Sequence, residues 1–109
     1  MTSKRLSDVK KLNQTIRDLS YLQKNSLEYF KALSAVISTR VQRQRIYGDD
    51  WTESPIDHEI WLIFEKFNRM MNLFKSKNTN SYEKLEDTVR DLVNYGLFLL
   101  AKLTKEAKK

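Results

Sequence analysis

The residues best suited to chemistry lie in two polar lines with helical spacing. Asp87, Asp91 and Asn94 follow one another at i, i+4 and i+7, so a helix places all three on one face. A second line with helical spacing consists of Trp61, Glu65, Asn68 and Asn72. If the two lines face each other, the carboxylates of Glu65, Asp87 and Asp91 converge. Three carboxylates beside amide groups suit Mg²⁺ or Mn²⁺, and such a metal can hold nucleotide phosphates and activate water.

An alternative interpretation of the same residues needs no metal. Arg69 follows Glu65 by four positions, so the two side chains can form an ion pair on the surface of one helix. Asp87 and Asp91 then belong to a solvated helix face. Because structural ion pairs are more common than functional sites, spacing alone leaves both interpretations open.

A second group of candidate residues surrounds the most obvious loop. Arg40, Arg43 and Arg45 precede Tyr47, and Trp51 follows four residues later. Guanidinium groups bind phosphate in a forked geometry, while the rings of Tyr47 and Trp51 offer flat faces to a nucleotide base. The two aromatic residues can also plug the end of a helix in the core, which is the more frequent role of such residues.

The elements that must position these residues are predicted to be α helices. Apolar residues recur every three or four positions over residues 6–47, which predicts one long helix or two helices that break near residues 24–26. Gly48 can adopt the positive φ that ends a helix. A proline at its start predicts a second helix over residues 55–75, and a polar connection separates it from a third helix over residues 81–105.

The predicted core stripes follow from the same periodicity. On the second helix the stripe consists of Ile60, Ile63, Phe64, Phe67, Met71 and Phe74. On the third helix it consists of Leu85, Val89, Leu92, Gly96, Leu99 and Leu103. Glycine inside a helix costs about 1 kcal/mol relative to alanine, so Gly96 is predicted to permit close approach of another helix. The sequence therefore predicts an all-α fold, a single domain over residues 1–109, built as a bundle of three to four helices whose remaining apolar stripe is covered either within the chain or by another chain.

Composition excludes several other classes of protein. Two glycines and one proline in 109 residues provide too few turns for a sheet protein. The chain has no cysteine, which excludes disulfides, thiol nucleophiles and cysteine-based zinc sites, and the single histidine, His58, receives no role. No apolar run approaches the roughly 18 residues of a membrane helix and no signal-peptide pattern occurs, so a cytoplasmic location is expected.

The net charge of +6 is distributed unevenly along the chain. Residues 1–47 contain ten Lys or Arg against three acidic residues, whereas residues 48–109 contain ten against eleven. A basic surface attracts anions, including nucleic acid, free nucleotides and acidic proteins. Residues 1–47 are therefore the predicted contact surface for a nucleic acid or an acidic protein partner.

Three segments together resemble the nucleotide modification associated domain family. They are RIYGDDW at residues 45–51, EKFNRMMNL at residues 65–73 and EDTVRDLVNY at residues 86–95. The resemblance extends over residues 40–103. This family is common in phages and their hosts and is related to MazG-like all-α NTP pyrophosphatases.

The resemblance implies a dimeric helical bundle that handles nucleotides. In MazG-like enzymes, a Glu-rich helix and an E-x-x-D helix bind Mg²⁺ for the cleavage of nucleoside triphosphates to a monophosphate and pyrophosphate. Asp91 matches the Asp of the second motif, whose Glu falls on Thr88, and Asp87 is the carboxylate that can stand in for it. The paired E-E-x-x-E of the first motif is reduced to Glu65. The missing carboxylates argue against hydrolysis more than they argue against nucleotide binding.

The leading hypothesis is a nucleotide-handling protein of MazG-like type which, if active, is a Mg²⁺-dependent nucleoside triphosphate pyrophosphohydrolase. The catalytic and metal-binding carboxylates would be Glu65, Asp87 and Asp91. The groups that neutralise phosphate charge would be Arg45, Lys66 and Arg69. The groups that position the base or sugar would be Tyr47, Trp51 and Asn94.

The alternative hypothesis is a phage-type or regulatory binding protein that keeps the bundle without catalysis. It would sequester a nucleotide or dock on a protein partner through its basic helical surface, and the missing carboxylates favour it. A third hypothesis, DNA binding through residues 1–47, is weaker, because no recognition helix with interleaved base-reading residues is present.

Overall fold

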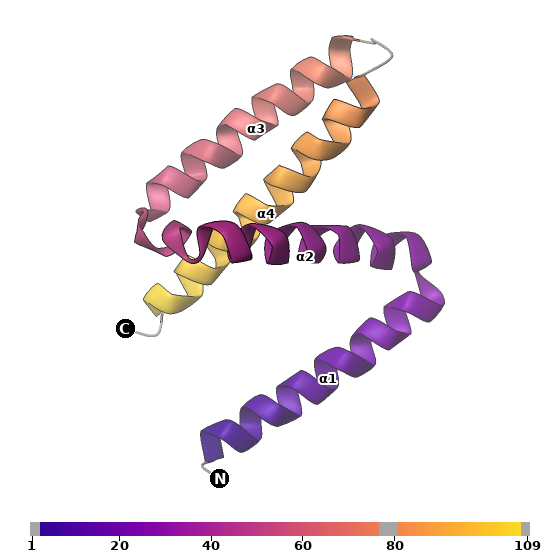
Figure 1. Cartoon of the computed structure of the whole chain (residues 1–109), viewed down its shortest axis with the longest axis vertical. Helices are drawn as coiled ribbons and strands as arrows, with labels where there is room; N and C mark the ends of the chain where they lie inside the picture. Colours follow the sequence, from indigo (N-terminus) through magenta and orange to yellow (C-terminus); the bar gives the residue numbers. More distant parts are fainter. Residues whose placement is uncertain (1–2, 77–80, 108–109) are drawn as a thin grey trace. The chain divides into compact units, whose positions relative to one another are not determined.

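The computed structural model describes residues 3–76 and 81–107, and these residues form four α helices, one short 3-10 helix and no strand (Figure 1). The all-α fold predicted from the sequence is confirmed for this part of the chain. The helices are α1 (Ser3–Asn25), α2 (Leu27–Tyr47), α3 (Ile56–Ser76) and α4 (Ser81–Ala107), with the 3-10 helix η1 (Asp50–Glu53) between α2 and α3. Within these described ranges, no helix combines the length and the apolar character that a membrane span requires.

The chain divides into two compact units, and each is described separately. The first contains the residues up to Ser38, and the second contains the residues from Thr39 onward. Helix α2 therefore contributes to both units. That residues 1–109 form a single domain stays a prediction.

The first unit contains a break between α1 and α2 at Ser26. Helical hydrogen bonds continue on both sides of it, because the Ser26 N–H donates to the Leu22 carbonyl (2.7 Å) and the Phe30 N–H donates to the Ser26 carbonyl (3.0 Å). The side-chain amide of Asn25 donates to the Tyr21 carbonyl (2.9 Å), and such local bonds from asparagine compete with continuation of a helix. Of the two alternatives that the sequence leaves open, the structure has two helices.

The second unit begins with the end of α2, which Gly48 terminates. Gly48 has a φ of 64°, as predicted, and its N–H donates to the Gln44 carbonyl (2.8 Å). Two side chains of α2 hold the turn that follows. The Arg40 guanidinium donates to the Gly48 carbonyl (3.3 Å), and the Gln44 amide donates to Asp49 Oδ1 (2.6 Å).

Helices α3 and α4 run side by side in opposite directions and form the body of the second unit (Figure 1). The apolar side chains that they half bury include Leu62, Ile63, Met70 and Leu73 of α3 and Leu85, Leu92 and Leu99 of α4. Among the described residues of this unit, the buried ones are polar, namely Glu59, Ser81, Thr88, Asn94 and Lys102. The apolar core of this helix pair is therefore incomplete within one chain.

The predicted core stripes are buried only in part. The stripe residues with exposed side chains are Ile60, Phe64, Phe67, Met71 and Phe74 on α3 and Val89 and Leu103 on α4. The difference has a physical reason, since periodicity shows which face of a helix is apolar but not whether the same chain covers it.

Gly96 also differs from its prediction. A Cβ placed on Gly96 meets no atom within 4 Å. The predicted close approach of another helix at this position is therefore wrong for the chain as described, because no neighbour requires the absence of a side chain there.

Candidate functional site

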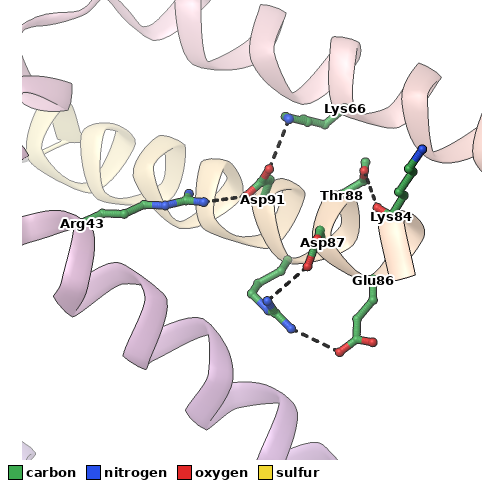
Figure 2. A network of polar contacts seen from close by, with 8 residues as sticks. Arg43, Lys66, Lys84, Glu86, Asp87, Thr88 and Asp91 are labelled. Atoms are coloured by element: carbon green, nitrogen blue, oxygen red, sulfur yellow. Dashed lines mark hydrogen bonds and ion pairs between the residues drawn. The ribbon is translucent and has the colours of Figure 1, made fainter. Parts of the chain in front are cut away.

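The carboxylate of Asp91 holds two cations from two other helices. Asp91 lies on α4, and its Oδ1 is 3.2 Å from Nη2 of Arg43 on α2. Its Oδ2 is 3.2 Å from Nζ of Lys66 on α3. Figure 2 shows the two basic side chains reaching this carboxylate from different directions. We call these three residues the ion triad. Since the Asp91 side chain is only 21% exposed, water screens this group less than a surface pair.

Asp87, one turn earlier on α4, belongs to a separate set of ion pairs. Its Oδ1 is 3.5 Å from Nη1 of Arg90, whose Nη2 is 3.2 Å from Oε1 of Glu86. In Figure 2 the side chain of Asp87 points away from Lys66 and α3, whereas that of Asp91 points toward them. The structure therefore brings Asp91 and Lys66 together and keeps Asp87 apart on the exposed surface of α4.

The carboxylates expected to bind a metal do not fit a divalent cation as they are placed. Among the described residues, no group of three or more His, Asp and Glu side chains is positioned to hold a metal ion. Both oxygens of Asp91 already contact cations, and Asp87 contacts Arg90. Thr88, which stands at the position of the family motif's Glu, is buried, and its hydroxyl donates to the Lys84 carbonyl (2.8 Å). Positive side chains thus contact Asp87 and Asp91, two of the three carboxylates expected to bind a metal.

An open groove of about 1030 Å³ lies along α3 and the start of α4. We call it the α3 groove. Two aromatic side chains in it, Trp61 and Phe64, are 55% and 54% exposed. Their ring centroids are 5.9 Å apart with an interplanar angle of 29°. Exposed aromatic faces of this kind can stack with a flat ligand ring.

The polar lining of the α3 groove is mostly basic. Lys66, Arg69 and Lys84 contribute positive charge, and Glu65 contributes the one carboxylate among its described lining residues. The remaining members of the polar line predicted on this helix, Asn68 and Asn72, also line the groove and offer amide donors and acceptors. An aromatic surface beside an excess of positive charge suits a ligand that combines a flat ring with anionic groups.

A smaller pocket of about 190 Å³ lies beside the loop after α2. The three residues predicted to position a base, Tyr47, Trp51 and Asn94, all line this loop pocket, together with Arg43. The ring of Trp51 stacks on Phe98 with a centroid distance of 4.5 Å and an interplanar angle of 14°. One face of Trp51 therefore packs against another side chain, which fits the alternative role of this residue in the core.

The predicted site residues thus fall into two neighbouring places. Glu65, Lys66 and Arg69 line the α3 groove, whereas Tyr47, Trp51 and Asn94 line the loop pocket. The ion triad connects the two, because Lys66 lines the groove, Arg43 lines the pocket, and Asp91 contacts both. Arg45 is exposed on α2 and lines neither cavity.

Sequence reasoning missed a buried ion pair between α3 and α4. Nζ of Lys102 is 2.8 Å from Oε1 of Glu59, and the two residues are only 8% and 2% exposed. The same ammonium group donates to the backbone carbonyl (2.6 Å) and to the hydroxyl (2.7 Å) of Ser54. One signal was available, since Lys102 is the only charged residue in an otherwise apolar run over residues 96–103. A charge in such a run indicates a buried partner.

Two polar atoms beside this ion pair have no hydrogen-bond partner among the described residues. They are Oε2 of Glu59 and Nε1 of Trp51, and both are buried. Nζ of Lys102 is 6.0 Å from the centroid of the Trp51 ring. The contacts of Lys102 with Glu59 and Trp51 therefore connect η1, which carries Trp51, to both α3 and α4.

A known protein family covers the part of the chain that contains these features. A family model described as nucleotide modification associated domain 1 matches residues 43–103, which is more than half of the chain. The matched range contains the ion triad and the whole α3 groove. No curated protein and no solved structure matches the chain.

Proposed function

Because this chain belongs to the nucleotide modification associated domain 1 family, we propose that it binds nucleotides in the α3 groove and does so without a metal ion. The observation that carries this proposal is the ion triad, in which each oxygen of Asp91 already contacts a positive side chain. A carboxylate in this state is a poor ligand for Mg²⁺, because the two positive side chains share its oxygen atoms and repel the ion.

The side chains of the groove support a specific arrangement of the ligand. The base would stack on Trp61 and Phe64, and the phosphates would contact Lys66 and Arg69, whose side chains are charge-assisted donors. Asn68 would donate to or accept from the edge of the base or the sugar hydroxyls. This arrangement places the phosphates at the side of the groove where Lys66 contacts Asp91.

The proposed relation to MazG-like all-α NTP pyrophosphatases is that the helical bundle is kept and its metal site is replaced. Asp91 occupies the position of a metal-binding Asp in that resemblance, and Arg43 and Lys66 supply the positive charge in place of the ion. The function is then retention of a nucleotide rather than its hydrolysis. A Mg²⁺-dependent pyrophosphohydrolase is the competing function.

Calorimetric titration with nucleoside mono-, di- and triphosphates tests this proposal, first in EDTA and then in Mg²⁺. We expect binding in EDTA and no release of pyrophosphate in Mg²⁺. Binding that requires Mg²⁺, or turnover of a triphosphate in its presence, would support the competing hydrolase. If no nucleotide binds in EDTA or in Mg²⁺, both the binding function and the hydrolase function are excluded.

The substitution Asp91→Asn separates the two functions by the sign of its effect. In the binding protein it removes a carboxylate that competes with phosphate for Lys66, so nucleotide affinity in EDTA rises by about twofold to fivefold, as expected for a partly exposed ion pair of about 1 kcal/mol or less. In a hydrolase it removes a metal ligand, so turnover falls.

Asp87→Asn is the matched control for Asp91→Asn. Asp87 lies on the same helix but contacts Arg90 outside the groove, so nucleotide affinity should not change. A weaker affinity of Asp91→Asn in EDTA, measured by the same titration, would contradict the proposal.

We also propose that a second copy of the chain completes the bundle. The support is the exposed apolar surface of the helix pair, which includes Val89, Val93, Leu97 and Leu100 on α4 at 38% to 59% exposure. These four positions lie on one stripe of the helix, and contiguous exposed apolar surface of this kind is typical of association sites.

Leu100→Lys should shift this dimer to monomer. Because a two-fold interface contains each substitution twice, we expect the dissociation constant to rise by about 100-fold or more. Sedimentation equilibrium measures the change, and Asp87→Lys on another face of α4 is the control. Equal dissociation constants for the two variants would exclude this face as the interface.

A further inference from the structure

Helix α1 exposes an apolar stripe to solvent between Val9 and Ile16. It buries none of its 23 residues. Val9, Leu12 and Ile16 are 40% to 59% exposed, and Leu19 continues their stripe as a half-buried residue. We call these four residues the α1 seam. A free apolar stripe on an otherwise polar helix is typical of a helix that has a partner.

The order of residue types in the α1 seam specifies the kind of partner. The spacings between successive residues are three, four and three, which is the spacing of alternating a and d positions of a heptad repeat. In this register β-branched Val9 and Ile16 occupy a positions, and Leu12 and Leu19 occupy d positions. This combination favours a parallel coiled coil of two strands.

The charged residues of α1 are placed so that two copies can pair. Lys10, Lys11 and Arg17 fall at b and c positions on the outer side, away from the seam. Between the ends of the seam, the e and g positions hold the neutral residues Asn13 and Thr15. Just outside it, Asp8 precedes the seam at a g position and Ser20 follows it at an e position. Along the seam, two copies of a basic helix would therefore meet without like charges across the interface, and the flanking positions offer no positive charge to a foreign acidic helix.

We propose that α1 pairs with the α1 of a second copy as a parallel two-stranded coiled coil. The proposal is independent of nucleotide binding and of the dimer surface on α4. The seam has only four layers, so pairing is weak on its own and depends on protein concentration. Paired in this way, the helices keep Lys10, Lys11 and Arg17 exposed to solvent on the outside.

Disulfide trapping in the full-length chain tests this inference, because the natural chain has no cysteine. In a parallel pair in register, the d positions of the two helices face each other at a distance that a disulfide can bridge. We expect Leu12→Cys to form a disulfide-linked dimer about tenfold faster or more under mild oxidation than Gln14→Cys, which has the same chemistry at an outer f position.

The rates of these two variants decide between the possible partners of α1. Equal rates would overturn the proposal, because an antiparallel pair, or docking of α1 on another surface, separates the two copies of residue 12. Combining Leu12→Cys with Leu100→Lys makes the two dimer surfaces distinguishable. If Leu12→Cys with Leu100→Lys still forms the disulfide faster than Gln14→Cys with Leu100→Lys, the coiled coil forms without the α4 interface. If the two rates become equal, the coiled coil depends on the α4 interface, which contradicts the proposed independence.

Discussion

Lys102→Ala lowers the free energy of unfolding by about 3 to 5 kcal/mol, which is the cost of leaving a buried charge without its partner. The substitution removes the ammonium group that lies 2.8 Å from Glu59 and that also donates to Ser54. Glu59 is almost fully buried, so water cannot replace the lost partner without opening the structure. Unfolding in urea, followed by circular dichroism, measures the change.

Two further variants show whether the effect comes from the ion pair. Lys105→Ala removes an exposed lysine from the same helix and should change stability by less than about 0.5 kcal/mol. The double variant Glu59→Leu with Lys102→Met replaces both charges by apolar groups and should recover most of the loss. A double variant as unstable as Lys102→Ala would show that packing, rather than the unpaired carboxylate, dominates.

The double substitution Trp61→Ala with Arg69→Ala weakens nucleotide binding by about 50-fold or more. Base stacking on an aromatic side chain contributes about 1 to 3 kcal/mol, and a hydrogen bond to a charged group contributes about 1.5 to 3 kcal/mol. Both side chains line the α3 groove and both are exposed, so their loss should leave the fold intact. Titration in EDTA measures the affinity.

The matched control removes an aromatic and a basic residue outside the α3 groove. Tyr82 and Lys75 line a different cavity near the junction of α3 and α4, and Tyr82→Ala with Lys75→Ala should bind nucleotides as the unaltered protein does. If the groove variant and this control bind equally well, the nucleotide lies elsewhere, and the loop pocket becomes the next candidate.

The sequence was sufficient for the helices because their signals are local. The positive φ at Gly48 follows from residues within one turn, whereas the break near residues 24–26 was one of two alternatives that the sequence left open. Periodicity also identified the apolar faces of α3 and α4. It did not show that Phe64 and Val89 remain exposed in one chain, because burial depends on what covers a face.

The candidate site was predictable only in part because its contacts are long-range. Asp87 and Asp91 have the same type and share a helix face, so spacing treats them alike. Asp87 contacts Arg90 on its own helix, whereas Asp91 contacts Arg43, which is 48 residues away in sequence. The choice between these partners depends on where α2 and α3 lie around α4, and helical periodicity contains no such information.

The buried contacts of Ser54 and Trp51 make the connection between α2 and α3 a rigid corner rather than a hinge. Bending it would withdraw Lys102 from the two oxygen atoms of Ser54 and separate the stacked rings of Trp51 and Phe98 at the same time. A molecule that enters the loop pocket must therefore match a preformed shape, and any adjustment to a larger ligand has to come from exposed side chains such as Tyr47.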